Sequence, residues 1–309
     1  MPASPVISAR GLVKKFGDRV AVAGIDVDVM PGEAFGFLGP NGAGKSSTMR
    51  MIGCVSPPSG GELRVLGMDP VREGPAIRAR LGVVPQDDTL DMELSVRDNL
   101  LTYARYFGIR RRQAAPKVDQ LLDFVQLADR ANDQVDALSG GMRRRLTIAR
   151  SLVNDPDIVL LDEPTTGLDP QARHLVWERL FRLKQRGTTL VITTHYMDEA
   201  EQLCDRLVVM DGGRIAAEGS PRSLIERYST REVVELRFGP EDRLDDLAGK
   251  LTGIGRVEVL PDRLLLYVDD GDAAVVEVHA RDVVPSSVLV RRSTLEDVFL
   301  HLTGRTLVD

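Results

Sequence analysis

The stretch Gly39-Pro40-Asn41-Gly42-Ala43-Gly44-Lys45-Ser46, followed by a further hydroxyl residue in Ser47, decides the fold of this chain. It is a complete phosphate-binding loop. The apolar run 34–38 before it predicts a buried strand, and 45–52 predicts a helix, which is the context that such a loop requires. The stretch therefore predicts an α/β fold of the P-loop NTPase class, with these residues binding a nucleotide.

The chemistry of the loop explains its spacing. Its glycines let the backbone curl so that N–H groups point at a phosphate, and the N-terminus of the following helix adds its dipole. Lys45 brings a positive charge to the β- and γ-phosphates, and the Ser46 hydroxyl is placed to ligate Mg²⁺. A glycine-rich turn that binds nothing is the alternative, which the Lys-Ser pair disfavours. We expect the loop to bind a nucleoside triphosphate with Mg²⁺.

Composition is typical of a soluble globular protein, with 43% hydrophobic and 28% charged residues. A length of 309 residues favours one large domain with a smaller appendage. No stretch approaches the roughly 18 apolar residues of a membrane span. Residues 1–8 lack the basic start and apolar core of a secretion signal, so we expect the protein to stay in the cytosol.

The charge distribution argues against nucleic acid as a partner. The net charge is −6, and residues 231–309 hold 10 Lys/Arg against 16 Asp/Glu, which accounts for the whole excess. The first 230 residues are balanced and show no basic stripe. We therefore expect no binding of a nucleic-acid backbone by charge.

Polar residues follow three apolar runs that we expect to be buried strands. Gln86 follows the run 81–84, Asp162 and Glu163 end the run 158–161, and His195 follows the run 189–193. The carboxyl ends of parallel strands share one sheet edge, where open α/β sheets bind their ligands. Asp162 suits the outer sphere of the magnesium ion, and Glu163 is placed to polarise a water that attacks the γ-phosphate. A structural role is the alternative for His195.

Two further segments point to the same nucleotide. Residues 6–29 alternate as antiparallel strands and carry Phe16, whose ring could stack on a purine or pack in the core. Residues from about 88 to 155 form an inserted helical lobe. Within it, Ser139 is a predicted helix cap, and Gly140 and Gly141 expose N–H groups, which makes a second anion site.

Taken together, these residues resemble the ATPases of ABC transporters. The matching motifs stand in the family's order over residues 6–220: Phe16 as the adenine-stacking aromatic, residues 39–46 as Walker A, Gln86 as the Q-loop glutamine, residues 138–142 as the signature, Asp162 and Glu163 as Walker B and the catalytic glutamate, Asp169 in the D-loop, and His195 as the switch histidine.

The resemblance implies a head-to-tail homodimer that sandwiches ATP. Ser139, Gly140 and Gly141 of one subunit, with Asp169 nearby, would then contact the nucleotide of the other. Gln86 would reach the magnesium ion and link the nucleotide state to an integral membrane permease subunit. Glu163 and His195 would act at the γ-phosphate. The protein would be peripheral, at the cytoplasmic face of the inner membrane.

Finer features resemble the exporter branch of that family. Met142 replaces the more common Gln of the signature, and residues 170–180 and 295–305 look like those of the nodulation-factor exporter ATPases. The daunorubicin exporter ATPases share the general plan. The resemblance implies export of a lipo-oligosaccharide or a hydrophobic drug. A soluble ABC-type ATPase acting on DNA or ribosomes is the alternative, which the absence of coiled-coil insertions and zinc cysteines disfavours.

The sequence divides into an ATPase domain, residues 1–228, and a small α+β domain, residues 229–309. In the second domain the patterns predict strand, helix, two strands, helix and strand, which is a ferredoxin-like order, followed by a helix capped by Thr294. No motif chemistry lies there. Dimer contact, regulation, docking to the membrane subunit and plain stabilisation all stay open as roles for this domain.

Overall fold

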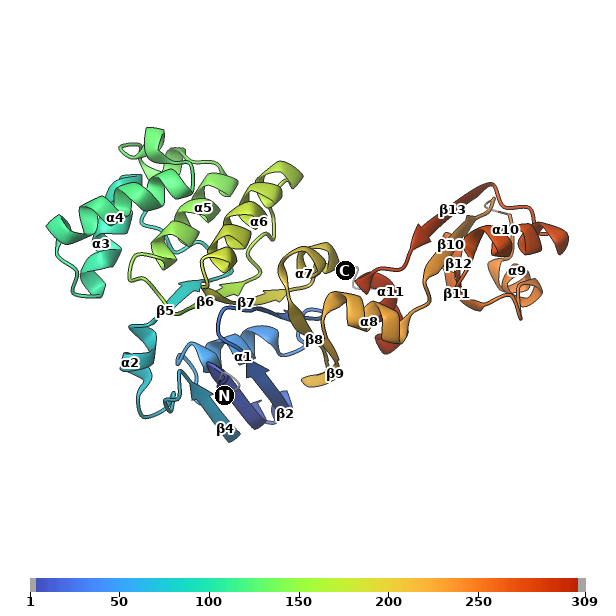
Figure 1. Ribbon diagram of the computed structural model, residues 1–309, viewed down its shortest axis with the longest axis horizontal. Helices are drawn as coiled ribbons and strands as arrows, with labels where there is room; N and C mark the ends of the chain where they lie inside the picture. The colour runs from blue at the N-terminus through green and yellow to red at the C-terminus, as the bar shows by residue number, and fades with distance from the viewer. Residues whose placement is uncertain (1–3, 240, 305–309) are drawn as a thin grey trace. The chain divides into compact units, whose positions relative to one another are not determined.

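The computed structural model describes residues 4–239 and 241–304, and its chain forms two compact units, Met1–Ser220 and Pro221–Asp309 (Figure 1). The sequence had placed this boundary after residue 228. Helix α8 (Pro221–Tyr228) falls in the second unit because it packs against helix α11 (Leu295–Thr303). Each unit has a hydrophobic core of its own.

The centre of the first unit is a six-stranded sheet in the order β5-β6-β7-β3-β8-β9. Its strands are β3 (Ala34–Leu38), β5 (Leu81–Val84), β6 (Ile158–Asp162), β7 (Thr189–Thr194), β8 (Arg206–Asp211) and β9 (Arg214–Gly219), of which only β9 runs antiparallel to its neighbour. The apolar runs predicted as buried strands are confirmed. Strands β8 and β9 were not anticipated. Because β5, β6 and β7 are adjacent and parallel, their carboxyl ends meet at one edge.

A second sheet of three antiparallel strands packs over the first through helix α1 (Lys45–Ile52). It consists of β1 (Ile7–Phe16), β2 (Arg19–Val29) and β4 (Gly60–Val65), in the order β2-β1-β4. One hydrophobic core contains Leu12 and Val22 from this sheet, Met51 from α1, and Leu160 and Val191 from the large sheet. Helix α1 therefore joins the two layers.

The helical lobe is made mainly of α3 (Val96–Tyr106), α4 (Arg111–Phe124) and α5 (Gly140–Ser151). Ser139 is the N-cap of α5, as predicted, and accepts a hydrogen bond from the Met142 N–H at 3.3 Å. Helix α5 also packs against β5 and so connects the lobe to the large sheet. The other α-helices described in this unit are α2 (Gly74–Arg78), α6 (Pro170–Gln185) and α7 (Met197–Leu203), and two short 3-10 helices, Ala128–Arg130 and Val135–Ala137, precede α5.

The second unit has the expected ferredoxin-like strand order. Its antiparallel sheet runs β11-β12-β10-β13 and consists of β10 (Glu232–Arg237), β11 (Arg256–Leu260), β12 (Arg263–Val268) and β13 (Ser287–Arg292). Helices α9 (Leu244–Lys250) and α10 (Gly271–Ala280) cover the face that carries Val234 and Leu236. Leu300 of α11 packs on the opposite face against Val233, Leu265 and Tyr267. Thr294 is the N-cap of α11, as predicted.

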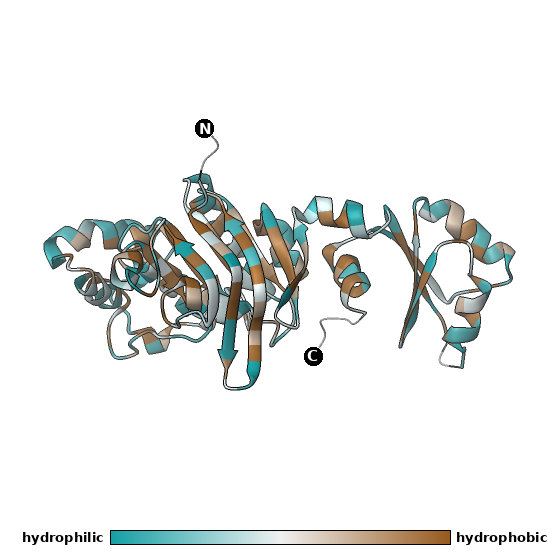
Figure 2. Ribbon diagram, turned by 90° about the horizontal axis from the view of Figure 1, so that it is seen from below, coloured by the Kyte–Doolittle hydropathy of each residue, from teal (hydrophilic) through white to brown (hydrophobic). Residues whose placement is uncertain are grey.

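Hydropathy follows these layers. Bands of hydrophilic and hydrophobic residues succeed one another along the strands (Figure 2), as expected for strands with one face in a core. In residues 4–239 and 241–304, no helix has both the length and the apolar character needed to cross a bilayer.

Candidate nucleotide site

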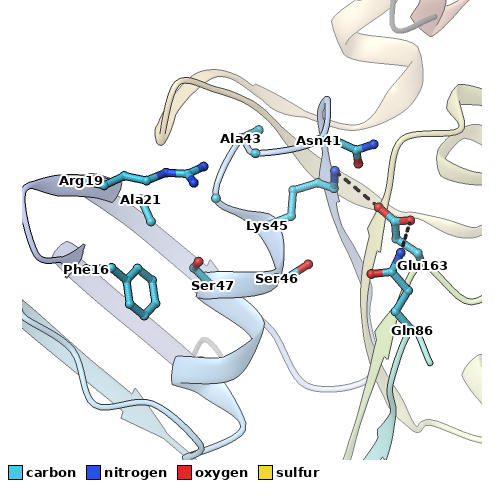
Figure 3. A pocket seen from close by; sticks show the side chains of 12 residues that line it. Phe16, Arg19, Ala21, Asn41, Ala43, Lys45, Ser46, Ser47, Gln86 and Glu163 are labelled. Carbon is cyan, nitrogen blue, oxygen red and sulfur yellow. Dashed lines mark hydrogen bonds and ion pairs between the residues drawn. The ribbon is translucent and has the colours of Figure 1, made fainter. Parts of the chain in front are cut away.

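One pocket of about 280 Å³ brings together most of the residues that the sequence assigned to a nucleotide (Figure 3). Its walls come from the small sheet, the phosphate-binding loop with α1, and the ends of β5 and β6. The lining residues are Phe16, Arg19, Ala21, Asn41, Gly42, Ala43, Gly44, Lys45, Ser46, Ser47, Gln86 and Glu163. Phe16 is half exposed at this site rather than packed in the core.

The loop needs glycine at two positions for different reasons. Gly44 has a φ of +104°, and a Cβ there would lie 2.5 Å from the Ala21 carbonyl oxygen. Gly39 has no unusual φ, but a Cβ would lie 2.3 Å from the Met210 carbonyl oxygen. Any side chain at either position would therefore displace backbone, and the loop conformation at the start of α1 depends on both residues.

Lys45 lies at the bottom of the pocket. Its Nζ donates hydrogen bonds to the carbonyl oxygens of Gly39 at 2.6 Å and Pro40 at 3.1 Å, and lies 3.7 Å from Oε1 of Glu163. Burial lowers the pKa of Lys45, while the negative charges of Glu163 and Asp162 oppose that shift. This ammonium group has only carbonyl oxygens within hydrogen-bond distance, so a phosphate oxygen would be a stronger partner.

Ser46 and Asp162 present adjacent oxygen atoms at the start of α1 and the end of β6. The Ser46 hydroxyl donates to Oδ1 of Asp162 at 3.1 Å, and the Thr193 hydroxyl donates to the same oxygen. Hard oxygen donors of this kind fit Mg²⁺. Among the described residues, no group of three or more His, Cys, Asp or Glu side chains could hold a metal by itself. An ion here would therefore take further ligands from phosphate and water.

Glu163 is the point at which the site converges. Its carboxylate is 6% exposed and accepts hydrogen bonds from Gln86 Nε2 at 3.3 Å and the Thr166 hydroxyl at 3.1 Å. Nδ1 of His195 lies 3.3 Å from Oε1 but has no hydrogen-bond partner of normal geometry. The nearby imidazole of His195 lowers the pKa of Glu163, burial opposes this, and the charge of Lys45 adds to the lowering.

The backbone at Glu163 is also unusual. Its φ is +47°, a conformation that costs energy for a residue with a side chain, and its N–H donates to the carbonyl and the hydroxyl oxygen of Thr193, both at 3.1 Å. The neighbouring strand β7 thus holds the turn that directs the carboxylate. Strand β7 also ends one residue before His195, which accounts for the proximity of the two side chains.

The signature residues lie apart from this pocket. Ser139, Gly140 and Gly141 form the N-terminus of α5, and they are not among the residues that line it. Asp169 is likewise absent from the lining and is the N-cap of α6, where its carboxylate accepts from the Ala172 N–H at 2.9 Å. Within one chain, therefore, the phosphate-binding loop and the signature at the N-terminus of α5 do not line the same pocket.

Several contacts at the site were not found from the sequence. Arg19 and Ala21 line the pocket from β2, Thr166 and Thr193 bond the two acidic residues, and Arg144 of α5 contacts the backbone around them. The position of Arg19, three residues after Phe16 across a tight turn, was the one available signal. The other contacts join segments far apart in the chain and leave no local pattern.

Two family models match the chain. The model described as ABC transporter matches residues 22–166, and the model described as Nodulation factor export protein NodI, C-terminal domain, matches residues 244–304. The matches fall in different units of the structure. The second match agrees with the resemblance of residues 295–305 to the nodulation-factor exporter ATPases and extends it over most of the small unit.

Curated relatives are similar over nearly the whole chain. A Nod factor export ATP-binding protein I from Rhizobium etli is 47% identical over 95% of this chain and 92% of its own length. The protein of the same name from Cupriavidus metallidurans is 47% identical over 98% of this chain and 99% of its length. That from Burkholderia lata is 46% identical, with both chains covered completely.

Solved structures are similar to the larger part of the chain. The ATP-binding cassette MJ0796, in a dimeric post-hydrolysis state bound to ADP and Pi, has a TM-score of 0.63 and 26% identity, covering 69% of this chain and 98% of its own. The cbiO1 protein of Clostridium perfringens, part of the ABC transporter complex cbiONQ, has a TM-score of 0.67 and 28% identity, covering 72% of this chain and 92% of its own.

Proposed function

We propose roles in ATP-driven export for individual residues of this chain, which belongs to the ABC transporter family, among the Nod factor export ATP-binding proteins. It is the ATP-binding and ATP-hydrolysing subunit of an exporter. The alternative of an ABC-type ATPase acting on DNA or ribosomes finds no support, since the relatives are named as export proteins. The roles of individual residues, the cargo and the partners are our proposals.

ATP lies along the pocket with its base at Phe16 and its phosphates over the loop. The half-exposed ring of Phe16 stacks on the adenine, and the N–H groups of residues 39–47 and the ammonium of Lys45 hold the phosphates. On binding, Lys45 exchanges its contacts with the Gly39 and Pro40 carbonyls for phosphate oxygens. The order of the lining residues from β1 to β6 supports this orientation.

Magnesium fits beside the phosphates. Ser46 would be a direct ligand, and Asp162 and Gln86 would hold the ion through water or directly. Bound Mg²⁺ neutralises negative charge on the phosphates. The Thr193 hydroxyl keeps Asp162 turned toward Ser46 and so preserves this arrangement of oxygen atoms.

Glu163 orients and deprotonates the water that attacks the γ-phosphate. Its carboxylate, whose pKa is lowered further from the usual range of glutamate, is ionised at neutral pH and can accept a proton. Gln86 and His195, which lie within 3.3 Å of its two oxygens, exchange this contact for the γ-phosphate and the water. The convergence of Lys45, Gln86 and His195 on one buried carboxylate is the observation that carries the mechanism.

Completion of the site requires a second copy. Ser139, Gly140 and Gly141 stand at a helix N-terminus that suits an anion, yet they line no part of their own chain's pocket. We therefore assign them, together with Asp169, to the γ-phosphate of a partner subunit in a head-to-tail homodimer. The dimeric state of the similar cassette MJ0796 supports this assignment.

The membrane subunit docks beside the nucleotide pocket. A second cavity of about 270 Å³ shares Ser46, Gln86 and Asp162 with the site and opens past Val55 and Val83, which are 74% and 41% exposed. An apolar segment seated there would touch Gln86 directly and would sense the nucleotide. We therefore propose that the chain is a peripheral protein on the cytoplasmic face of the inner membrane.

The cargo is a Nod factor or a related lipo-oligosaccharide. The similarity to Nod factor export proteins extends through the small unit, and both family models match. We assign the first unit, Met1–Ser220, to ATP hydrolysis and the second, Pro221–Asp309, to an accessory role in the assembled exporter.

Copurification tests the partner, and stimulation of ATPase activity tests the cargo. Tagged Glu163→Gln protein, extracted mildly from native membranes with ATP and Mg²⁺, should bring an integral membrane protein with it in stoichiometric amount. The wild-type complex, reconstituted in vesicles, should then hydrolyse ATP faster with a lipo-chitooligosaccharide than with daunorubicin. Recovery of a soluble dimer alone would count against the partner, and equal stimulation would count against the cargo.

A further inference from the structure

Arg144 joins the signature helix to the edge of the large sheet. It lies in α5, shortly after the N-cap Ser139, and is 5% exposed. Its Nε donates to the carbonyl oxygen of Pro164 at 2.7 Å, and its Nη2 to those of Asp162 and Glu163, both at 3.0 Å. Its Nη1 donates to the carbonyl oxygens of Pro85 and, at 3.4 Å, Gln86. One guanidinium group therefore bonds the ends of both β5 and β6.

Three of these five carbonyl groups belong to residues that act on the nucleotide or its magnesium ion, and the other two belong to prolines next to them. The backbone carbonyl oxygens of Gln86 and Glu163 accept hydrogen bonds from Arg144. Asp162, whose carbonyl oxygen also accepts from Arg144, is the last residue of β6 and directly precedes Glu163. The loop after Glu163 is also held from its other side, where the Thr165 hydroxyl donates to the buried carboxylate of Glu199 at 2.7 Å. Arg144 thus fixes the backbone of Gln86 and Glu163 at a set distance from Ser139.

The bonding of Arg144 differs from that of an arginine that only stabilises a fold through an ion pair. All of its hydrogen bonds go to neutral carbonyl oxygens, and no carboxylate lies within ion-pair distance of it among the contacts of the described residues. Burial lowers the pKa of this guanidinium, and the charge of Asp88 opposes the shift. A buried cation is costly unless its donors are all satisfied, so a displacement of either strand end relative to α5 would be resisted.

We propose that Arg144 is a positioning residue that couples the γ-phosphate end of its own ATP site to the signature that it presents to the partner subunit. When Gln86 and Glu163 shift on binding ATP, the guanidinium carries that shift to the N-terminus of α5. Ser139, Gly140 and Gly141 are then brought to the partner's nucleotide only when the chain's own site is filled. The inference rests on the roles proposed above for Gln86, Glu163 and Ser139.

The next residue in the helix supplies a matched control. Arg145 is partly buried on the same turn, but its Nη1 donates to the Val125 carbonyl at 2.7 Å and to Gln126 at 3.4 Å, both in the helical lobe. Its pKa is likewise lowered by burial. Loss of Arg145 therefore removes a buried guanidinium of α5 without touching the strand ends.

The test uses the full chain with Arg144→Ala, Arg144→Lys, Arg145→Ala and Arg145→Lys. We expect Arg144→Ala to lower kcat for ATP hydrolysis roughly 10- to 100-fold, the size of effect that a misplaced catalytic group produces, with KM for ATP changed less than about 3-fold. Millimolar guanidinium should restore a large part of the activity of Arg144→Ala and none in Arg145→Ala. In a Glu163→Gln background, Arg144→Ala should also prevent dimerisation with ATP.

Three outcomes overturn the proposal: an unchanged kcat in folded Arg144→Ala and Arg144→Lys proteins, equal losses in the Arg144 and Arg145 variants, or ATP-dependent dimers that form without Arg144. If Arg144→Ala does not fold, the same comparison is made with the two lysine variants, since lysine keeps the charge but cannot bond both strand ends. Fast hydrolysis by Glu163→Gln alone would instead refute the proposed function, so the two failures are distinguishable.

Discussion

Two clusters of buried charge, one in each unit, differ in how their members are bonded. The Glu163 cluster consists of Lys45, Gln86, Glu163 and His195, and the Asp297 cluster of Glu235, Tyr267, Arg291 and Asp297. In the first, the contacts to the carboxylate of Glu163 from these residues are 3.3 to 3.7 Å long, and Nδ1 of His195 has no hydrogen-bond partner. The cluster borders a pocket that reaches solvent.

The Asp297 cluster is satisfied within the protein. The Asp297 carboxylate, 1% exposed, accepts from Nη1 and Nη2 of Arg291 at 2.7 and 2.9 Å and from the Thr294 N–H at 2.8 Å. Nε of Arg291 donates to Glu235 at 2.6 Å. Burial alone would raise the pKa of Asp297, but Arg291 and Thr294 hold it below its usual range.

The comparison shows that burial and a shifted pKa do not by themselves identify a functional site. The pKa values of both Glu163 and Asp297 are lowered, yet the partners of one are poorly matched and those of the other are complete. Long contacts beside a cavity can be exchanged for contacts to a ligand at small cost. A closed network at the base of α11 instead stabilises the unit that contains it.

The largest effect is expected from Glu163→Gln. Because the amide cannot accept a proton from water, kcat for ATP hydrolysis should fall by about 10²- to 10⁴-fold, while ATP binding persists. Steady-state ATPase assays and equilibrium ATP binding on the same preparation measure the two quantities. Size-exclusion chromatography with ATP should show a trapped dimer. If Glu163→Gln hydrolysed ATP within a few-fold of the wild-type rate, the Glu163 cluster could no longer be distinguished from the Asp297 cluster by a role in catalysis.

Asp297→Ala tests the other cluster. Leaving Arg291 without its main partner should destabilise the second unit by about 3–5 kcal/mol, as for other broken buried pairs. Hydrogen exchange of peptides from residues 232–303 reports the loss, and ATPase activity of the isolated subunit should change less than about 2-fold. Asp262→Ala, at a more exposed carboxylate bonded to Arg237, serves as the control. A large loss of hydrolysis in Asp297→Ala would show that the clusters are coupled.

Lys45→Ala tests whether the charge of Lys45 serves ATP binding rather than the stability of the fold. Removal of a charged donor from the phosphates should cost about 1.5–3 kcal/mol, which weakens ATP binding roughly 10- to 150-fold and abolishes measurable turnover at ordinary ATP concentrations. Titration calorimetry with ATP measures the affinity. Thermal stability without ATP should change little, because Lys45 bonds only two carbonyl groups and lies 3.7 Å from Glu163. Normal ATP affinity would contradict the assignment of the loop.

The smallest effect is expected in the pH dependence of stability, to which both clusters contribute because each contains a carboxyl with a lowered pKa. A carboxyl whose folded pKa is lowered stabilises the protein above its unfolded value, about 3.9 for Asp, and that contribution is lost as the pH falls through the folded pKa. Stability of the second unit should therefore be flat above about pH 5 and fall below about pH 4. Asp297→Asn should lower the stability above pH 5 and flatten the fall. An unchanged slope would show that Asp297 is not the titrating group.

The sequence predicted the parts of the molecule that have local patterns. The run 34–38, the loop and the helix 45–52 are found with those bounds, since strand, glycine turn and helix each follow from neighbouring residues. The same holds for the strand order of the second unit, whose short alternating segments leave few topologies. Of the residues expected at the nucleotide, Phe16, residues 41–47, Gln86 and Glu163 line one pocket, and the adjacent ends of β5 and β6 bring the last two to it.

Contacts between segments far apart in the chain could not be predicted from local sequence patterns. In the sequence, Arg144 is one of three consecutive arginines after the signature, and no feature of the neighbouring residues distinguishes it from Arg145. The domain boundary was misplaced around α8 for the same reason, since its packing partner α11 lies some seventy residues later along the chain. Strands β8 and β9 were missed because neither segment carries a motif.

Helix α1 has a consequence for how long the protein survives in a cell. The helix that begins at the phosphates also holds the two sheets of the first unit together, so ATP binds to the element on which that unit's core depends. At 100 times its dissociation constant, a ligand adds about 2.7 kcal/mol to the stability of the form that binds it. When ATP is scarce, a larger share of the subunits opens transiently and is exposed to proteases. The abundance of the exporter would then follow the energy supply of the cell without any dedicated sensor.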